Sequence, residues 1–174
     1  MIAIQPAAAE DVPALDALLR TTFAAPDEAN LVRDLCVEGS MVLVFVAREE
    51  DSGALVGMVA FSRMEVRVGV KDVQAVALAP VAVLPEYRQQ GVAEALIRGG
   101  LERLEAAGVV LCFVLGDPAF YGRFGFDADI ASGFESRYAG EHFMALPLQG
   151  GLIPCGDRDI AHHAPAFARL GTAA

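Results

Sequence analysis

The spacing of apolar residues predicts a chain that mixes β-strands with helices. Strand character comes from alternating apolar and polar residues or from short, wholly apolar stretches. A polar turn at residues 49–53 joins two of these segments as an antiparallel hairpin, and another turn lies within residues 69–72. The segments with strand character are residues 2–4, 41–47, 55–64, 66–76, 78–84, 109–115 and 143–148.

Apolar residues at helical spacing predict three main helices. The first opens at Asp11 and carries an apolar stripe, and the second is capped by Asp27. A third and clearer stripe ends before Gly108. The residues of the first stripe are Val12, Leu15, Leu18, Leu19 and Phe23, and those of the third are Ala93, Leu96, Ile97, Gly100, Leu101 and Leu104.

The third helix lies between two stretches that are apolar on both faces, residues 78–84 and 109–115. Such stretches are typical of buried central strands, and a helical crossover between them makes the two strands parallel. Residues 150–174 show weak periodicity, so we expect them to be irregular and packed on the body. We therefore predict one α/β domain over residues 1–174, with a core at 1–148 and an irregular extension at 149–174.

Charge and composition restrict the possible partners. With 13 basic and 23 acidic residues, the formal net charge is −10, which argues against nucleic acid as a partner. The chain is 55% hydrophobic, yet no apolar run approaches the roughly 20 residues that cross a bilayer. The start of the chain lacks signal-peptide character, and three cysteines suggest reduced thiols, so we expect a cytoplasmic protein. The large apolar content is compatible with a homodimer.

The segment Val81–Ala93 carries the strongest chemical signal. An apolar strand runs into a polar loop, and the loop runs into a helix N-terminus, whose first amides have no partner within the helix. With the helix dipole these amides bind anions, and the small residues Gly91 and Ala93 let a phosphate approach the backbone. Arg88 adds a positive charge. A diphosphate can therefore bind here although the protein is acidic overall.

This segment resembles the acetyl-CoA signature of the GCN5-related N-acetyltransferase (GNAT) superfamily. That signature is Gln or Arg, two residues, Gly, one residue, then Gly or Ala, and Arg88–Ala93 matches it. The resemblance implies a mixed, mostly antiparallel curved sheet with a splayed central pair of parallel strands, flanked by helices. It also implies that acetyl-CoA is the cosubstrate. Pro80, which cannot donate to a strand ladder, fits a place where strands separate.

The resemblance implies a role for each residue of the segment. The amides of the loop and first helical turn would hold the pyrophosphate, and the backbone of Val81 and Val83 would bind the pantetheine arm. The Val83 amide would also stabilise the oxyanion of the tetrahedral intermediate. The residues implied for the pyrophosphate are Arg88, Gln89, Gln90, Gly91, Val92, Ala93 and Glu94.

A second motif, Gly116–Phe126, resembles the family's Asp, Phe-Tyr and Gly-Phe pattern. By that match Tyr121 is the general acid, and a phenol with a pKa of about 10 suits protonation of a thiolate at neutral pH. Asp117 caps a short helix and is implied to contact the pantetheine. Tyr121 could instead serve only as a packed aromatic residue, and Asp117 only as a cap. The wider pattern over residues 1–148 is similar to the YhbS-like branch of predicted acetyltransferases.

We therefore expect an N-acetyltransferase that moves acetyl from acetyl-CoA to a primary amine by direct attack. The alternatives are a non-catalytic acyl-CoA-binding or regulatory domain on the same fold and a purely structural domain. The general base is open among Glu28, Glu65, Asp72 and a water chain. Two features are set aside: Cys112, which lies in a buried strand, and the His162-His163 pair with Cys155, whose spacing fits no metal site.

Overall fold

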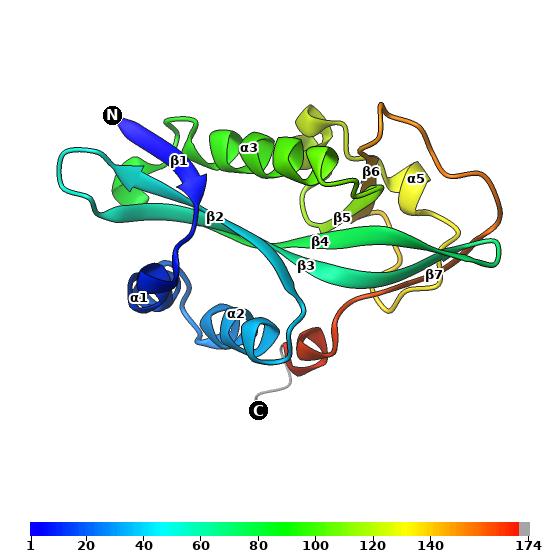
Figure 1. Ribbon diagram of the computed structural model, residues 1–174, viewed down its shortest axis with the longest axis horizontal. Helices are drawn as coiled ribbons and strands as arrows, with labels where there is room; N and C mark the ends of the chain where they lie inside the picture. Colours follow the sequence, from blue (N-terminus) through cyan, green and yellow to red (C-terminus); the bar gives the residue numbers. More distant parts are fainter. Residues whose placement is uncertain (171–174) are drawn as a thin grey trace. The chain divides into compact units, whose positions relative to one another are not determined.

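The computed structural model describes residues 1–170 and shows a seven-stranded sheet combined with helices (Figure 1). The strand order is β1-β2-β3-β4-β5-β6, and β7 pairs with β3. The sheet is mostly antiparallel, with one parallel pair formed by β4 and β5. The strands are β1 (Ile2–Pro6), β2 (Met41–Glu49), β3 (Leu55–Val68), β4 (Lys71–Val83), β5 (Leu111–Leu115), β6 (Phe143–Pro147) and β7 (Arg158–His162).

The three long helices lie where apolar spacing predicts them. One detail is wrong: Asp27 does not cap the second helix but is its first residue, and Pro26 occupies the N-cap position. The short helix after Asp117 is also confirmed, whereas α5 had no sequence signal that we used. The helices are α1 (Val12–Thr22), α2 (Asp27–Val37), α3 (Val92–Ala106), α4 (Pro118–Tyr121) and α5 (Ala128–Ala131).

The two segments predicted around the middle of the chain, 66–76 and 78–84, belong largely to one strand, β4. Its parallel pairing with β5 runs from Ala75 opposite Leu111 to Ala77 opposite Phe113. Pro80 lies beyond the last of these pairs, as expected of a residue that cannot donate to a ladder.

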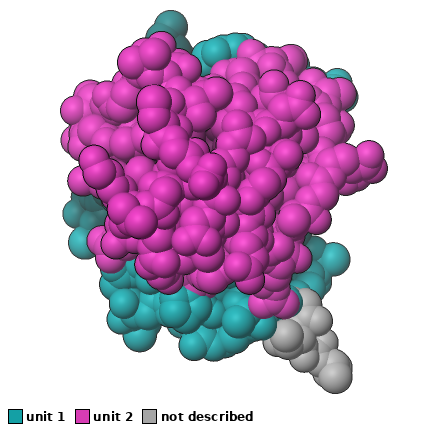
Figure 2. All heavy atoms as spheres, turned by 90° about the vertical axis from the view of Figure 1, so that its right-hand side faces the viewer, with its two compact units in different colours: residues 1–61, 79–100, 165–174 teal, residues 62–78, 101–164 magenta. Residues whose placement is uncertain are grey.

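The chain divides into two compact units, which Figure 2 colours separately. The first unit comprises residues 1–61 and 79–100 together with the segment from Pro165 onward. The second comprises residues 62–78 and 101–164.

The core of the first unit joins α1 and α2 to three strands. Most residues of the predicted apolar stripe of α1 are buried here, but Val12, the first residue of α1, is 61% exposed. Phe23, just after α1, packs against the core rather than lying within it. The buried residues of this core cluster are Leu15, Leu18, Leu19, Ala29, Val32, Val46, Met58, Ala60 and Ala82.

Two glycines inside α3 are explained by close packing against strands. A Cβ atom added at Gly100 would lie 2.4 Å from a ring carbon of Phe61 on β3, which is fully buried. One added at Gly99 would lie 3.0 Å from the ring of Phe45 on β2. Real Cβ atoms do not approach a ring as closely as 2.4 Å, so Gly100 lets the helix approach the sheet.

We expect Gly100→Ala to destabilise the protein by up to about 2 kcal/mol. Ala favours a helix over Gly by about 1 kcal/mol, but overpacking of a filled core costs roughly 1–3 kcal/mol and here outweighs that gain. Chemical denaturation measures the difference. Gly122→Ala is the control, since a Cβ at Gly122 meets nothing within 4 Å and its φ is −58°. Equal stability of the two variants would contradict the packing argument.

The second unit contains a strand that sequence analysis missed. We expected residues 149–174 to be irregular, but β7 pairs antiparallel with β3, with Glu65 opposite His162 and Val66 opposite Ala161. The Arg158 side chain fixes the start of β7, because one of its nitrogens donates to the carbonyls of Asp129 at 2.7 Å and Ser132 at 2.8 Å.

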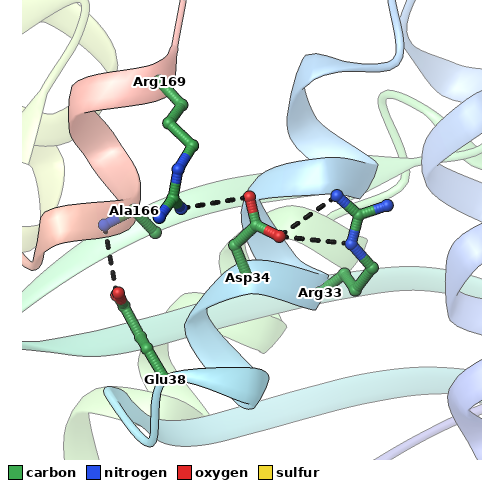
Figure 3. Close-up of polar contacts among 5 residues, drawn as sticks. All are labelled: Arg33, Asp34, Glu38, Ala166 and Arg169. Carbon is green, nitrogen blue, oxygen red and sulfur yellow. Dashed lines mark hydrogen bonds and ion pairs between the residues drawn. The ribbon is translucent and has the colours of Figure 1, made fainter.

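The end of the described chain docks on α2, within the first unit (Figure 3). The Ala166 amide donates to Glu38 at 3.1 Å, and Arg169 donates to Asp34 at 3.2 Å. Arg33 also donates to Asp34. Ala166 and Phe167 are buried, so an apolar contact accompanies the polar ones and anchors this segment to α2.

Candidate functional site

The loop between β4 and α3 has the geometry of an anion site. The amide of Ala95 donates to the Gly91 carbonyl at 3.0 Å, so Gly91 directly precedes the helix. The amides between Gly91 and Ala95, those of Val92 to Glu94, belong to the first turn of α3, where the helix itself offers no acceptor. Gly91 has a φ of +78°, which favours glycine, and Gln89 also has a positive φ of 61°. The predicted pyrophosphate residues therefore lie together at the N-terminus of a 15-residue helix.

Side chains of the same loop hold its shape. The Arg88 Nε donates to the Val83 carbonyl at 3.0 Å, and the Gln90 Nε2 donates to the Glu86 carbonyl at 3.0 Å. Arg88 therefore has a second role that sequence analysis did not foresee: it closes the loop onto the end of β4. The Glu94 side chain pairs with Arg98 at 3.0 Å, which offsets its negative charge beside the anion site.

The end of β4 presents backbone groups on the side away from β3. The Leu84 amide donates to Val56 of β3 at 2.9 Å. Amides of successive residues in a strand point to opposite edges, so the backbone groups of Val83 and Val81 point away from β3. The contact between the Val83 carbonyl and Arg88 agrees with that direction. This is the orientation that the family resemblance requires of both residues.

Tyr87 and Glu49 support the loop, and sequence analysis missed both. The Tyr87 hydroxyl donates to Glu49 at 3.0 Å, and the Ser52 hydroxyl donates to the same oxygen at 3.0 Å. The bonds from Ser52 and Tyr87 lower the pKa of Glu49, and the bond to Glu49 raises the pKa of Tyr87. No local signal could reveal this pair, because 38 positions separate its members.

In the second unit, the motif Gly116–Phe126 forms a capped turn of helix. Asp117 accepts a bond from the Ala119 amide at 3.0 Å, which confirms its capping role. Gly125 ends the following turn with a φ of 100°. Asp117 itself is exposed, so its carboxylate caps the helix from the surface.

Tyr121 is buried within an aromatic group of the same motif. Its ring lies edge-on to Phe120 at 4.9 Å and to Phe126 at 5.9 Å. A Cβ at Gly116 would lie 2.5 Å from the Tyr121 ring, so the glycine makes room for it. Burial, together with the nearby Cys112, raises the pKa of Tyr121, which keeps the phenol protonated at neutral pH.

The three carboxylates considered as general base differ in their surroundings. Glu65 and Asp72 are 62% and 79% exposed, and both pair with Arg67, which also approaches Asp159. Glu28, in the first turn of α2, is partly buried. The structure thus places two candidates in one surface ion network of the second unit and the third in the first unit.

The features set aside supply no reactive group or metal site. Cys112 is fully buried, and burial raises the pKa of its thiol far above its usual range, so it is protonated and unreactive. Within residues 1–170, His, Cys, Asp and Glu side chains form no group that could hold a metal ion. No helix in the same range is long and apolar enough to cross a membrane.

The sequence, taken with this strand–loop–helix geometry, defines the class of protein. The family model of the acetyltransferase (GNAT) domain matches residues 3–128, so the chain belongs to the GNAT acetyltransferase family. This confirms the resemblance drawn from Arg88–Ala93 and from the Gly116–Phe126 motif.

Similar proteins indicate which branch of the GNAT family the chain belongs to. The chain is 42% identical to the uncharacterized N-acetyltransferase YhbS of Escherichia coli K12 over 130 residues, which are 75% of this chain and 76% of that protein. It is similar to the crystal structure of Escherichia coli YhbS in complex with CoA, with a TM-score of 0.88, 35% identity and coverage of 98% of this chain and 93% of that one. A GNAT acetyltransferase from Brucella melitensis, in complex with acetyl-CoA, gives a TM-score of 0.76 at 27% identity, covering 96% and 98% of the two chains.

Proposed function

We propose that the protein transfers an acetyl group from acetyl-CoA to a primary amine. The observation that carries the proposal is the loop before α3, where the first turn of the helix, Gly91 with its positive φ and the Arg88 side chain lie together. Membership of the GNAT family supports it, as do the complexes of two relatives with CoA and acetyl-CoA.

In this proposal the pyrophosphate of acetyl-CoA binds the amides of Gln89 to Glu94 and the charge of Arg88. These donors are fixed before the ligand arrives, because the Arg88 and Gln90 side chains brace the loop. The pantetheine arm binds the outward backbone groups of Val81 and Val83, and Asp117 contributes to the same arm. A preformed set of donors reduces the entropy lost on binding.

The transfer itself proceeds by direct attack. The neutral amine nitrogen forms a bond to the thioester carbon, and the Val83 amide donates to the oxygen that becomes negative. The addition gives a tetrahedral intermediate. When it collapses, the carbon–sulfur bond breaks and the electron pair goes to sulfur. Tyr121 gives its phenolic proton to the thiolate, the amine nitrogen loses one proton to the surrounding medium, and the Tyr121 phenolate takes one proton back from that medium. The products are an N-acetylated amine and free CoA.

Arg88→Gln should raise the Kd for acetyl-CoA about tenfold, because a charge-assisted bond to phosphate is lost together with the brace on Val83. Isothermal titration calorimetry measures the change. Arg20→Gln is the matched control: it removes the same charge from α1, where Arg20 pairs only locally with Asp16 at 2.9 Å. An Arg88 variant that binds acetyl-CoA as tightly as the control would remove Arg88 from the site.

A further inference from the structure

The turn between β2 and β3 is tied to the loop before α3 through one carboxylate. Glu49 ends β2, and its Oε2 atom accepts hydrogen bonds from the Tyr87 and Ser52 hydroxyls, each at 3.0 Å. Tyr87 directly precedes Arg88, which opens the proposed pyrophosphate segment. In Figure 1 this turn lies beside the loop between β4 and α3. A residue of β2 is therefore connected to the candidate anion site through a single side chain.

Ionisation strengthens the bond between Tyr87 and Glu49. The bonds from Ser52 and Tyr87 lower the pKa of Glu49, so its carboxylate is charged at neutral pH. The bond to Glu49 raises the pKa of Tyr87, so the phenol keeps its proton and remains the donor. A hydrogen bond to a charged acceptor is roughly twice as strong as one between neutral groups. Loss of this bond should therefore have a measurable effect on the segment that Tyr87 positions.

The turn that carries Glu49 is itself anchored. The Gly53 amide donates to the Glu49 carbonyl at 2.7 Å and closes the turn. One Arg48 nitrogen donates to the Gly53 carbonyl at 2.9 Å, and another donates to Asp11 at 2.7 Å. Asp11 is buried, and all of these residues belong to the first unit. Glu49 thus offers Tyr87 a fixed partner.

The loop after Tyr87 depends on contacts that hold its conformation. Gln89 has a φ of 61°, and a residue other than glycine keeps a positive φ only where its surroundings enforce it. The braces from Arg88 and Gln90 act within β4 and the loop, whereas the bond from Tyr87 reaches another strand, β2. This bond therefore fixes the start of the loop relative to β2.

We propose that Glu49, acting through Tyr87, is a positioning residue for the diphosphate of acetyl-CoA. The inference rests on the proposed function and adds a residue of β2 to the determinants of cosubstrate affinity. The bond holds the start of the segment Arg88–Ala93 in the conformation that presents its amides to the diphosphate, so less conformational entropy is lost on binding. Loss of the bond should weaken binding of the diphosphate and leave the contacts of the pantetheine arm unchanged.

Isothermal titration calorimetry with acetyl-CoA and with 3′-phospho-ADP, the half of CoA that carries the diphosphate, tests this role. Tyr87→Phe removes the donor, and Glu49→Ala removes the acceptor. We expect each variant to raise the Kd of both ligands by the same factor, about three- to tenfold. Glu49→Gln keeps an acceptor oxygen and should show a smaller increase. Glu49→Ala introduced into Tyr87→Phe should add little, because both changes break one bond.

Glu50→Ala is the matched control, since it removes the same charge from the adjacent, exposed position. Removal of a negative charge by itself favours an anionic ligand, so a weaker affinity in Glu49→Ala would arise from the lost bond. The control should bind both ligands at least as tightly as wild type.

Wild-type Kd values in Tyr87→Phe would overturn the role of Glu49 and leave the proposed transferase standing. A larger increase for acetyl-CoA than for 3′-phospho-ADP would place the effect on the whole site and overturn the positioning of the diphosphate. Binding of acetyl-CoA but not of 3′-phospho-ADP by wild type would also overturn it. Failure of wild type to bind acetyl-CoA at all would overturn the proposed function itself, and this inference with it.

Discussion

Tyr121→Phe should lower kcat about 100-fold or more and change the Kd for acetyl-CoA less than threefold. General acid catalysis contributes roughly 10²–10⁴ in rate, and the variant removes only the proton that the thiolate needs. The ring should stay in place, because its position depends on packing against Phe120, Phe126 and Gly116. The hydroxyl group is not needed for this packing. Pre-steady-state and steady-state turnover, measured beside acetyl-CoA titrations, separate the two effects.

Tyr138→Phe is the matched control, because it removes a phenolic hydroxyl from the same unit but outside the Gly116–Phe126 motif. It should retain wild-type turnover. If Tyr121→Phe also turned over at the wild-type rate, Tyr121 would be a packing residue and the thiolate would gain its proton elsewhere. The non-catalytic alternative predicts a third pattern, in which acetyl-CoA binds but no variant, wild type included, acetylates an amine.

Acidification from pH 7 to pH 4 should cost the protein about 3 kcal/mol of unfolding free energy through His163 alone. Burial, reinforced by Arg137 and His162, lowers the pKa of His163 from 6.5 to about 4. Its ring packs against Tyr138 at 4.8 Å and near Phe143 at 6.1 Å. In the unfolded chain His163 becomes protonated below pH 6.5, whereas in the folded protein it stays neutral down to about pH 4. The free energy of unfolding therefore falls as the pH is lowered from 6.5 to 4.

Denaturant unfolding at a series of pH values isolates this contribution. The difference in stability between wild type and His163→Phe should shift by about 3 kcal/mol in favour of the variant between pH 7 and pH 4. The variant cannot accept the proton, so this component of the pH dependence is absent from it. His142→Gln, at an exposed position, is the control and should follow wild type. Parallel curves for wild type and His163→Phe would contradict the buried, neutral state of His163.

Local patterns predicted those parts of the fold that depend on neighbouring residues. The prediction of α3 from its apolar stripe is confirmed, because Leu96, Ile97, Leu101 and Leu104 are buried. The anion loop succeeds for a similar reason, since Gly91 and the start of α3 are adjacent in sequence. Asp117 likewise caps the helix that begins at the next residue.

Features that depend on distant partners escaped prediction. The strand β7 is short, and its pairing with β3 joins residues about a hundred positions apart, such as Glu65 and His162. The contact between Tyr87 and Glu49 that supports the loop is equally invisible in a local pattern. The difference between Glu28 and Glu65 is a matter of burial and of the partner Arg67, neither of which residue type reveals.

Product analysis of a single reaction mixture tests the central claim most directly. The protein is incubated with acetyl-CoA and three primary amines, 1,4-diaminobutane, lysine amide and glycinamide. Mass spectrometry quantifies the acetylated amine, and a thiol reagent quantifies CoA. The account predicts equal amounts of the two products, formation that depends on the amine, and formation of both about 100-fold more slowly in Tyr121→Phe. Release of CoA with free acetate as the only acetyl product, or no release with acetyl-CoA bound, would contradict it.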